Sequence, residues 1–283
     1  MKVSLEEYPG GAARSEGPWP FVTRYGYTEG GRRIVWLARE HRKGLDRGGD
    51  RSGPELPLWQ RPGYNWSVGA FFAVGSLLFM LGSVFSLIPR AMAPSGFAIN
   101  VVFFLGSIPF TIAGYLQHFQ SANAPGFATA GGAARSDGAM ALVGWRPRDL
   151  GWLSTFTQFI GTLAFNVSTL NAILVSSGPR LQDIAVWTPD MVGSVMFLVS
   201  GYLAYIESSH GYWSWKPRNL AWQIVFVNLI GCIAFMTSGI LSYVPQGPES
   251  AWITAVANTH LLIGGFCFFV GAVLSMRESR TTG

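Results

Sequence analysis

Four polar side chains inside long apolar stretches of the sequence are the first candidates for chemistry. Gln158 and Asn228 occupy the same position of an internal repeat, Asn166 lies deeper in the stretch that holds Gln158, and His260 lies in the last apolar stretch. Polar groups within a membrane are rare, and they often mark the paths of solutes and ions. Alternatively, such side chains form hydrogen bonds between helices, worth about 0.6 kcal/mol on average in a membrane. The sequence leaves both interpretations open for these ligand or pathway candidates.

The sequence argues against catalysis, haem and metal binding. A cytochrome b haem site needs two histidines at the same depth on facing helices, and His118, His210 and His260 form no such pair. No metal-binding His–Glu spacing, phosphate-binding glycine loop or acyl-transfer nucleophile is recognisable. Cys232 and Cys267 fall in neighbouring apolar stretches at different depths and are interpreted as small core residues. We therefore expect no enzyme activity, and we predict no metal or cofactor.

The elements that carry these side chains are long apolar runs. The chain is 49% hydrophobic and 12% charged, a composition typical of membrane proteins. A membrane-spanning helix needs about 20 apolar residues, and a barrel strand would alternate polar and apolar residues, which these runs do not. We predict an all-α polytopic membrane protein with six transmembrane helices, near residues 66–89, 96–118, 152–175, 187–207, 220–244 and 252–275.

The distribution of basic residues predicts the orientation. Eleven of the 20 Lys and Arg residues precede Trp66, and seven more lie in the even-numbered loops and the C-terminal tail, against only Arg90 and Arg180 on the other side. Basic residues accumulate on the cytoplasmic side of a membrane protein. Both termini are therefore expected to be cytoplasmic. The pI of about 9.4 is explained by this topology, so we expect no nucleic-acid partner.

An internal repeat is the most informative pattern of the sequence. Two Trp residues seven positions apart precede each odd-numbered span, and a Gly and then a Phe follow at constant distances. The three sets are Trp59, Trp66, Gly75 and Phe79; Trp145, Trp152, Gly161 and Phe165; and Trp215, Trp222, Gly231 and Phe235. The even-numbered spans share Gly106 with Phe110, Gly193 with Phe197 and Gly264 with Phe268. The repeating unit is thus a helical hairpin, and three tandem hairpins predict a pseudo-threefold bundle.

Small residues at these positions suit close helix contacts. We expect Gly75, Gly161, Gly231, Gly106, Gly193 and Gly264 to be helix-packing residues, because small side chains let helix backbones approach in lipid. Trp66, Trp152, Trp222, Arg148, Arg218 and Glu207 are expected to be interfacial anchors. Glu207 occupies the same repeat position as Gln120 and Glu278, and we expect it to pair with Arg148 or Arg218. Asp149 and Asn219 are positioned to cap the helices that follow them.

The repeat divides the chain into consecutive units. The predicted division is a cytoplasmic N-terminal segment (1–58), hairpin 1 (59–120), a flexible cytoplasmic loop (121–144), hairpin 2 (145–208), hairpin 3 (209–279) and a tail (280–283). Residues 21–37 predict a β-hairpin, since two runs of β-forming residues flank a Gly-rich turn. The basic run that follows, residues 39–43, suits either anionic lipid headgroups or a solvated flank that enforces topology.

Residues in two spans resemble a known family. Span two carries Phe110, Thr111, Ala113, Gly114, Tyr115, Leu116 and Gln117, and span five carries Asn228, Leu229, Ile230 and Gly231 with Ala234 and Phe235. On these residues, positions 59–279 resemble the YrhK-like family of bacterial integral membrane proteins, here as three tandem two-helix units. The resemblance implies a multi-pass protein of the bacterial cytoplasmic (inner) membrane. It supplies no catalytic motif to transfer.

Two functions are compatible with these patterns. The first is a non-enzymatic scaffold or accessory subunit that binds lipid, pigment or a larger membrane protein complex through aromatic-rich helix faces, since the chain has 20 Phe residues. The second is a small-solute transporter or channel with a pathway along the repeat axis, lined by Gln158, Asn166 and Asn228. The scarcity of ionisable groups inside the spans argues against ion-coupled transport. The sequence favours the first hypothesis.

Overall fold

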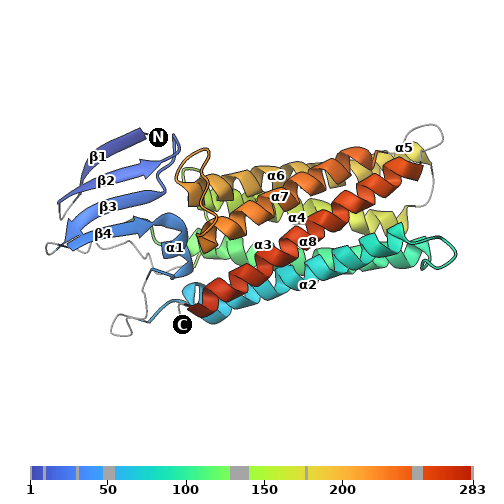
Figure 1. Ribbon diagram of the computed structural model, residues 1–283, viewed down its shortest axis with the longest axis horizontal. Helices are drawn as coiled ribbons and strands as arrows, with labels where there is room; N and C mark the ends of the chain where they lie inside the picture. The colour runs from blue at the N-terminus through green and yellow to red at the C-terminus, as the bar shows by residue number, and fades with distance from the viewer. Residues whose placement is uncertain are drawn as a thin grey trace.

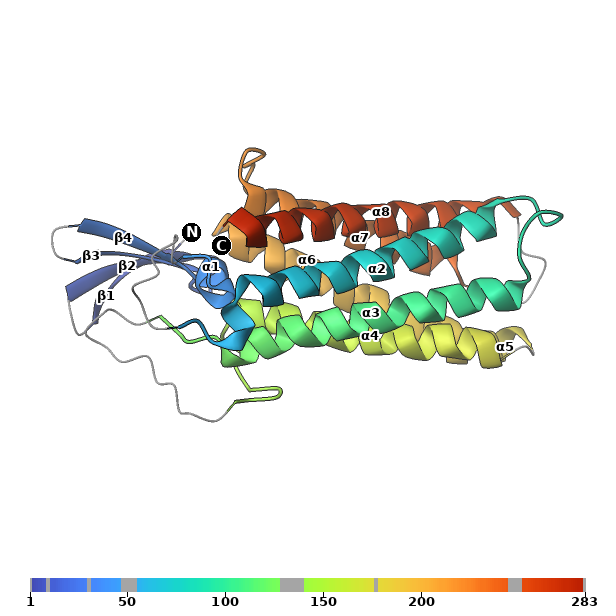
Figure 2. The same ribbon diagram turned by 90° about the horizontal axis from the view of Figure 1, so that it is seen from below.

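A four-stranded sheet sits at one end of a long helical bundle (Figures 1 and 2). The computed structural model describes residues 2–8, 11–29, 32–46, 55–127, 140–175, 178–243 and 251–281. The N- and C-termini both lie near the sheet, at what we call the sheet end of the bundle; the opposite end is the distal end. The chain is mostly helical, as the apolar runs predict.

Six long helices run the length of the bundle. They are α2 (Pro62–Leu87), α3 (Gly96–Asn123), α4 (Leu150–Leu174), α6 (Thr188–Ser209), α7 (Leu220–Leu241) and α8 (Ala251–Thr281). The short helix α5 (Pro179–Gln182) and a π-helical segment (Asp183–Trp187) lead directly into α6. Around the bundle each helix packs against two others in the closed order α2, α3, α4, α6, α7, α8 and back to α2.

Five helices in the described part of the chain are long and apolar enough to cross a membrane, as in a multi-pass membrane protein. They are α2, α3, α7, α8 and the continuous helix Pro179–Ser209. The sequence predicts a sixth span over α4, which has a matching length of 25 residues. However, α4 does not reach the same hydropathy, because nine of its residues are Ser, Thr, Asn or Gln.

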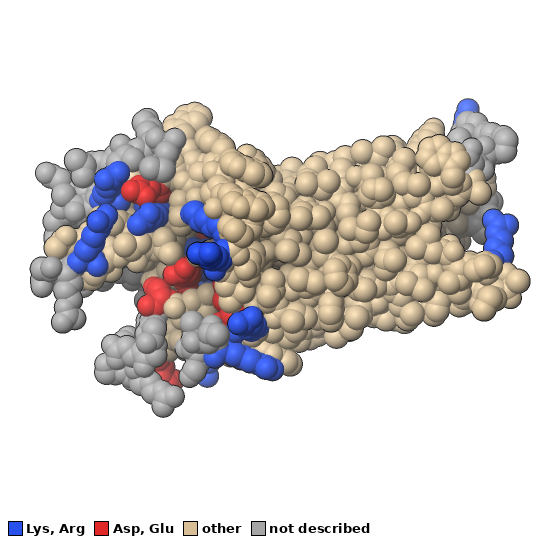
Figure 3. All heavy atoms as spheres, viewed as in Figure 1, with Lys and Arg blue, Asp and Glu red and all other residues tan. Residues whose placement is uncertain are grey.

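The helix starts follow from local sequence. The side chains of Asp149 and Asn219 each accept a hydrogen bond of 2.9 Å, from the backbone N–H of Trp152 and Trp222 respectively. These bonds satisfy N–H groups that the first turn of a helix leaves without partners. Pro62 occupies the first turn of α2, where a missing N–H costs nothing. Charged side chains gather at the two ends, and the middle of the face in Figure 3 has none.

The sheet is an antiparallel meander of β1 (Lys2–Tyr8), β2 (Gly11–Gly17), β3 (Arg24–Glu29) and β4 (Arg32–Leu37), in that order. The pair β3–β4 is the hairpin that residues 21–37 predict, with Tyr25 opposite Trp36. Strands β1 and β2 are additional to the prediction. The six-residue helix α1 (Ala38–Lys43) follows β4 and places the predicted basic run at the sheet end of the bundle.

Two predicted interfacial anchors lie inside the protein. Trp152 and Trp222 are only 1% and 3% exposed, and their indole N–H groups donate to the carbonyls of Val143 and Ser214. Trp66 remains 39% exposed on the outer face of α2. Trp152 and Trp222 are buried because the segments before α4 and α7, which include Val143 and Ser214, fold back over the starts of these helices. Residues 128–139 of the predicted flexible loop 121–144, and tail residues 282–283, lie outside the described residues.

Candidate functional site: two cavities on the bundle axis

Six phenylalanines, one from each long helix, fill the centre of the bundle. Phe110, Phe197 and Phe268 come from α3, α6 and α8, and their ring centroids lie 5.9 to 6.4 Å apart. In the other set, the Phe235 ring lies 5.8 Å from Phe79 and 5.9 Å from Phe165. Edge-to-face contacts of 5.0 to 5.4 Å join the two sets. We call these six residues the Phe plug.

Glycines on the facing helices leave the space that the plug occupies. A Cβ atom on Gly161 would lie 2.7 Å from the ring of Phe197, closer than side chains tolerate. The remaining glycines of the predicted set make corresponding contacts, Gly75 with Phe110, Gly231 with Phe268, Gly106 with Phe79, Gly193 with Phe165 and Gly264 with Phe235. All six predicted helix-packing glycines therefore lie where two helices meet around a phenylalanine.

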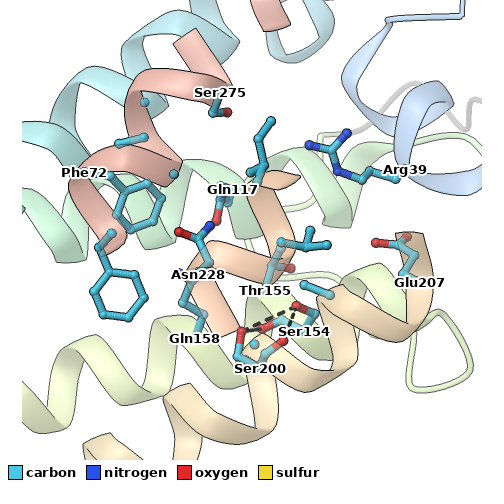
Figure 4. A pocket seen from close by; sticks show the side chains of 18 of the residues that line it. Arg39, Phe72, Gln117, Ser154, Thr155, Gln158, Ser200, Glu207, Asn228 and Ser275 are labelled. Carbon is cyan, nitrogen blue, oxygen red and sulfur yellow. Dashed lines mark hydrogen bonds between the residues drawn. The ribbon is translucent and has the colours of Figure 1, made fainter. Parts of the chain in front are cut away.

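A cavity of about 110 Å³ lies between the Phe plug and the sheet end. Phe197 and Phe268 of the plug form part of its wall, and Gln158, Asn228 and Gln117 supply amide groups (Figure 4). The wall also holds two serines that bond each other across α4 and α6: Ser200 Oγ donates to the Ser154 carbonyl at 2.7 Å, and Ser154 Oγ donates to the Ser200 carbonyl at 3.0 Å. Two of the four predicted pathway residues, Gln158 and Asn228, thus share this sheet-end cavity.

Helix α1 places basic side chains at the mouth of the sheet-end cavity. Arg42 donates to both carboxylate oxygens of Glu207, at 2.6 and 2.8 Å. Arg39 makes the same two-bond contact with Glu278, at 2.7 and 2.9 Å, and Lys43 Nζ lies 2.8 Å from that carboxylate. We call Arg39, Arg42 and Lys43 with Glu207 and Glu278 the α1 latch. Glu207 therefore pairs with Arg42, whereas Arg148 and Arg218, its predicted partners, are exposed.

Burial dominates the electrostatics of the α1 latch. Removal from water, followed by the neighbouring Arg39, lowers the pKa of Lys43 to about 8, against the opposing effect of Glu278. Burial also acts to lower the pKa of Arg39 and Arg42, but the carboxylates of Glu278 and Glu207 outweigh it and raise both pKa values. The two arginines therefore stay charged, and paired carboxylates compensate their desolvation.

Two features of the latch were missed by the sequence analysis. Gly151, at the start of α4, leaves room for Arg42, because a Cβ atom there would overlap the guanidinium and lie 2.8 Å from Glu207 Oε1. Gln120, at the predicted equivalent of the two glutamates, has no charge to offer and instead donates to Asn65 Oδ1 at 2.9 Å. Asn65 in turn donates to the Lys43 carbonyl. The end of α1 is thus held on a third side by neutral hydrogen bonds.

A second cavity of about 360 Å³ lies between the Phe plug and the distal end. Phe79, Phe165 and Phe235 separate it from the sheet-end cavity, and Asp190, Asn100 and Ser238 supply polar groups to its wall. The sequence analysis did not single out Asp190. The available signal was an acidic residue just after Pro189, inside an otherwise apolar helical run.

The other two predicted pathway residues line neither cavity. Asn166 Nδ2 donates to Thr111 Oγ1 at 2.7 Å, which joins α4 to α3. This contact matches the alternative interpretation, a hydrogen bond between helices. His260 Nδ1 lies 2.9 Å from the Val256 carbonyl within α8. In the described part of the chain, no group of three His, Cys, Asp or Glu side chains is placed to hold a metal ion.

No family model, curated protein or solved structure matches the chain. The resemblance to the YrhK-like family therefore stays a prediction. Function has to be argued from the two cavities, the Phe plug between them and the latch at the sheet end.

Proposed function

We propose that this protein conducts a small polar solute along the axis of its bundle, as a transporter or channel that is closed in this conformation. The observation that carries the proposal is the placement of two cavities at opposite ends of the bundle, on either side of the Phe plug. Hydrophobic constrictions close pores by excluding water, and polar side chains in the flanking cavities replace the hydration of a solute. The Phe plug is the constriction in this proposal.

The same positions support six spans arranged as three tandem hairpins about a pseudo-threefold axis. Helix α4 takes a place in the ring between α3 and α6, although its composition is more polar. Its polar residues Gln158, Thr155 and Ser154 line the sheet-end cavity, and Ser168 and Thr169 line the distal one, which supports a span that lines a polar path. A helix that lines a polar path can cross a membrane with such residues.

We propose that the sheet end, with both termini, is cytoplasmic, and that the membrane is the cytoplasmic (inner) membrane of a bacterium. The distribution of basic residues along the sequence supports this orientation, because 18 of the 20 fall in the segments predicted for that side, while Arg90 follows α2 and Arg180 lies in α5. The α1 latch then lies at the cytoplasmic mouth of the path.

The rival hypothesis of a scaffold rested on aromatic-rich helix faces. The phenylalanines at the predicted repeat positions point into the bundle, and the exposed helix surface is mainly aliphatic, for example Val74, Leu77 and Leu81 on α2. Such a surface suits lipid chains. A scaffold that binds lipid, pigment or a membrane protein complex stays a prediction of the sequence, and the geometry favours the pathway.

Solute flux through reconstituted protein tests the proposal. Proteoliposomes are shifted into hyperosmotic glycerol, choline chloride or sodium glutamate, and their reswelling reports entry of a neutral, cationic or anionic solute. Replacing the buried plug residue Phe268 with alanine is expected to speed reswelling severalfold for at least one solute. Its matched control is Phe266→Ala on the same helix, because Phe266 is 54% exposed on the outer face.

The control variant is expected to behave like the unmodified protein. Thermal unfolding in detergent establishes that both variants fold. If folded Phe268→Ala proteoliposomes swell no faster than protein-free liposomes in all three solutes, the pathway proposal is wrong.

A further inference from the structure

The distal cavity contains a carboxylate without a partner. Asp190 is partly buried, and within the described residues no donor forms a hydrogen bond with it and no basic side chain pairs with it. The residues that line the cavity include no Lys, Arg or His. An ionised carboxylate without a cation is costly at such a site, so a cationic ligand there would be bound favourably.

The position of Asp190 in its helix does not offset that cost. An acidic residue at a helix N-terminus is stabilised by the helix dipole. Although α6 begins at Thr188, the helical run is continuous from Pro179 to Ser209, so Asp190 lies eleven residues inside it. The π-helical segment Asp183–Trp187 lies just before it, and such segments are frequent at functional sites.

The space beside the carboxylate is kept open. Gly239 on α7 faces Asp190, and a Cβ atom there would lie 3.2 Å from Asp190 Oδ2 and 2.9 Å from Ser194 Oγ. Trp187 is held next to this position, because its indole N–H donates to the Gly239 carbonyl at 2.9 Å. The fold thus fixes an aromatic ring near the carboxylate and excludes a side chain that would cover it.

Aromatic rings make up much of the remaining wall. Phe79, Phe103, Phe165, Phe235 and Trp187 all line the cavity. The faces of aromatic rings attract cations, and cages of such rings recognise alkylated ammonium groups. A metal ion needs several oxygen ligands, and one carboxylate among aromatic rings is a poor set for it. The volume of about 360 Å³ suits a small organic molecule.

The sheet end offers an internal precedent for this chemistry. There, Glu278 binds the ammonium group of Lys43 at 2.8 Å, and Glu207 binds the guanidinium of Arg42. All the basic side chains that line either cavity come from α1, outside the bundle. Among the residues that line the two cavities, the charged side chains from the long helices are the carboxylates Glu207 and Asp190.

We infer that the distal cavity binds an organic ammonium group through Asp190 and the surrounding aromatic rings. The group belongs to a free solute or to a lipid headgroup, which share this chemistry. The inference rests on the proposed function in one respect: it takes the distal cavity as one end of the solute path, and so makes cations the transported class.

Binding of labelled choline to purified protein in nanodiscs of phosphatidylglycerol tests the inference. We expect saturable binding that Asp190→Asn weakens at least tenfold, since the amide keeps the shape of the side chain and loses its charge. The matched control is Asp183→Asn, an acidic position in the same helical run that does not line the cavity. The control is expected to bind within twofold of the unmodified protein.

Two competitors define the ligand class and its source. The uncharged isostere of choline, in which carbon replaces the ammonium nitrogen, is expected not to compete. Nanodiscs that also contain phosphatidylethanolamine separate the two sources: weakened choline binding there assigns the site to a headgroup, and unchanged binding assigns it to a free solute. No saturable binding, equal binding by Asp190→Asn, or equal competition by the isostere would each overturn the inference.

The outcomes for binding and for flux are separable. Choline binding that depends on Asp190 in a protein that passes no solute would leave the ammonium site standing and refute the pathway. Flux through Phe268→Ala without choline binding would support the pathway and refute the ammonium site.

Discussion

The two ends of the bundle differ in how their carboxylates are paired. At the sheet end, Glu207 accepts two hydrogen bonds from Arg42, and Glu278 accepts two from Arg39. Lys43 also donates to Glu278. At the distal end, Asp190 faces a larger cavity with no partner among the described residues. The basic side chains of the chain pair with the carboxylates at one end, and none lines the cavity at the other. The paired carboxylates of the sheet end thus stabilise the fold, whereas Asp190 at the distal end is available to bind a ligand.

Breaking the latch is expected to have the largest effect on stability. Arg42→Ala leaves the 2% exposed side chain of Glu207 charged and without its partner, which costs about 3–5 kcal/mol for a buried ion pair. Thermal unfolding in detergent measures the loss. The control is Arg61→Ala, since Arg61 pairs with Glu55 at the surface, where 53% and 93% of the side chains are exposed. Such a pair contributes less than about 1 kcal/mol. Equal losses in the two variants would refute the latch.

Neutralising the distal carboxylate is not expected to destabilise the protein. Asp190→Asn removes a carboxyl group that has no partner among the described residues, so it should leave the stability of the empty protein unchanged or raise it slightly. Glu207→Gln, the same change at the sheet end, should destabilise it, because Arg42 loses its counter-charge. Unfolding in detergent without added choline compares the two. A lower melting temperature for Asp190→Asn would show that Asp190 has a stabilising partner.

The contact between the sheet and the bundle predicts the smallest effect at neutral pH. His210 Nδ1 lies 3.0 Å from Thr23 Oγ1, and burial, followed by Lys216 and Arg24, lowers the pKa of His210 to about 4 from 6.5. Between these values the unfolded chain binds more protons than the folded one, so stability is expected to fall as pH drops from 6.5 to 4.

His210→Asn should remove this acid-side loss and leave stability above pH 7 almost unchanged. Asparagine tolerates the left-handed backbone at this position, where φ is 56°. Unfolding temperatures measured from pH 4 to pH 8 give the comparison. Identical pH profiles for the variant and the unmodified protein would show that His210 titrates freely in the fold.

Local and periodic patterns in the sequence predicted much of the fold. The spacing of glycine and phenylalanine identified the positions of the Phe plug, and Asp149 and Asn219 marked the starts of two helices. These features depend on neighbours within a few turns or on a spacing that recurs, so sequence alone exposes them. The β3–β4 hairpin was found for the same reason.

Long-range pairing was beyond the sequence. Arg42 and Glu207 are 165 residues apart, and Arg39 and Glu278 are 239 apart, so no local pattern connects them. The basic run 39–43 was therefore assigned to lipid or solvent. Asp190 was overlooked because its meaning depends on what surrounds it: one acidic residue near a span end is unremarkable until a cavity lined by aromatic rings lies beside it.

The central claim is that the two cavities are the opposite halves of one path, closed by the Phe plug. Its most direct test is thiol labelling with a membrane-impermeant reagent, in a background with Cys232 and Cys267 replaced by alanine. Ser275→Cys reports the sheet-end cavity and Ser238→Cys the distal one. The account predicts that the two cysteines react from opposite sides of the membrane, and that adding Phe268→Ala lets reagent on one side reach both. Labelling of both cysteines from the same side with the plug intact, or of neither once it is opened, would contradict it.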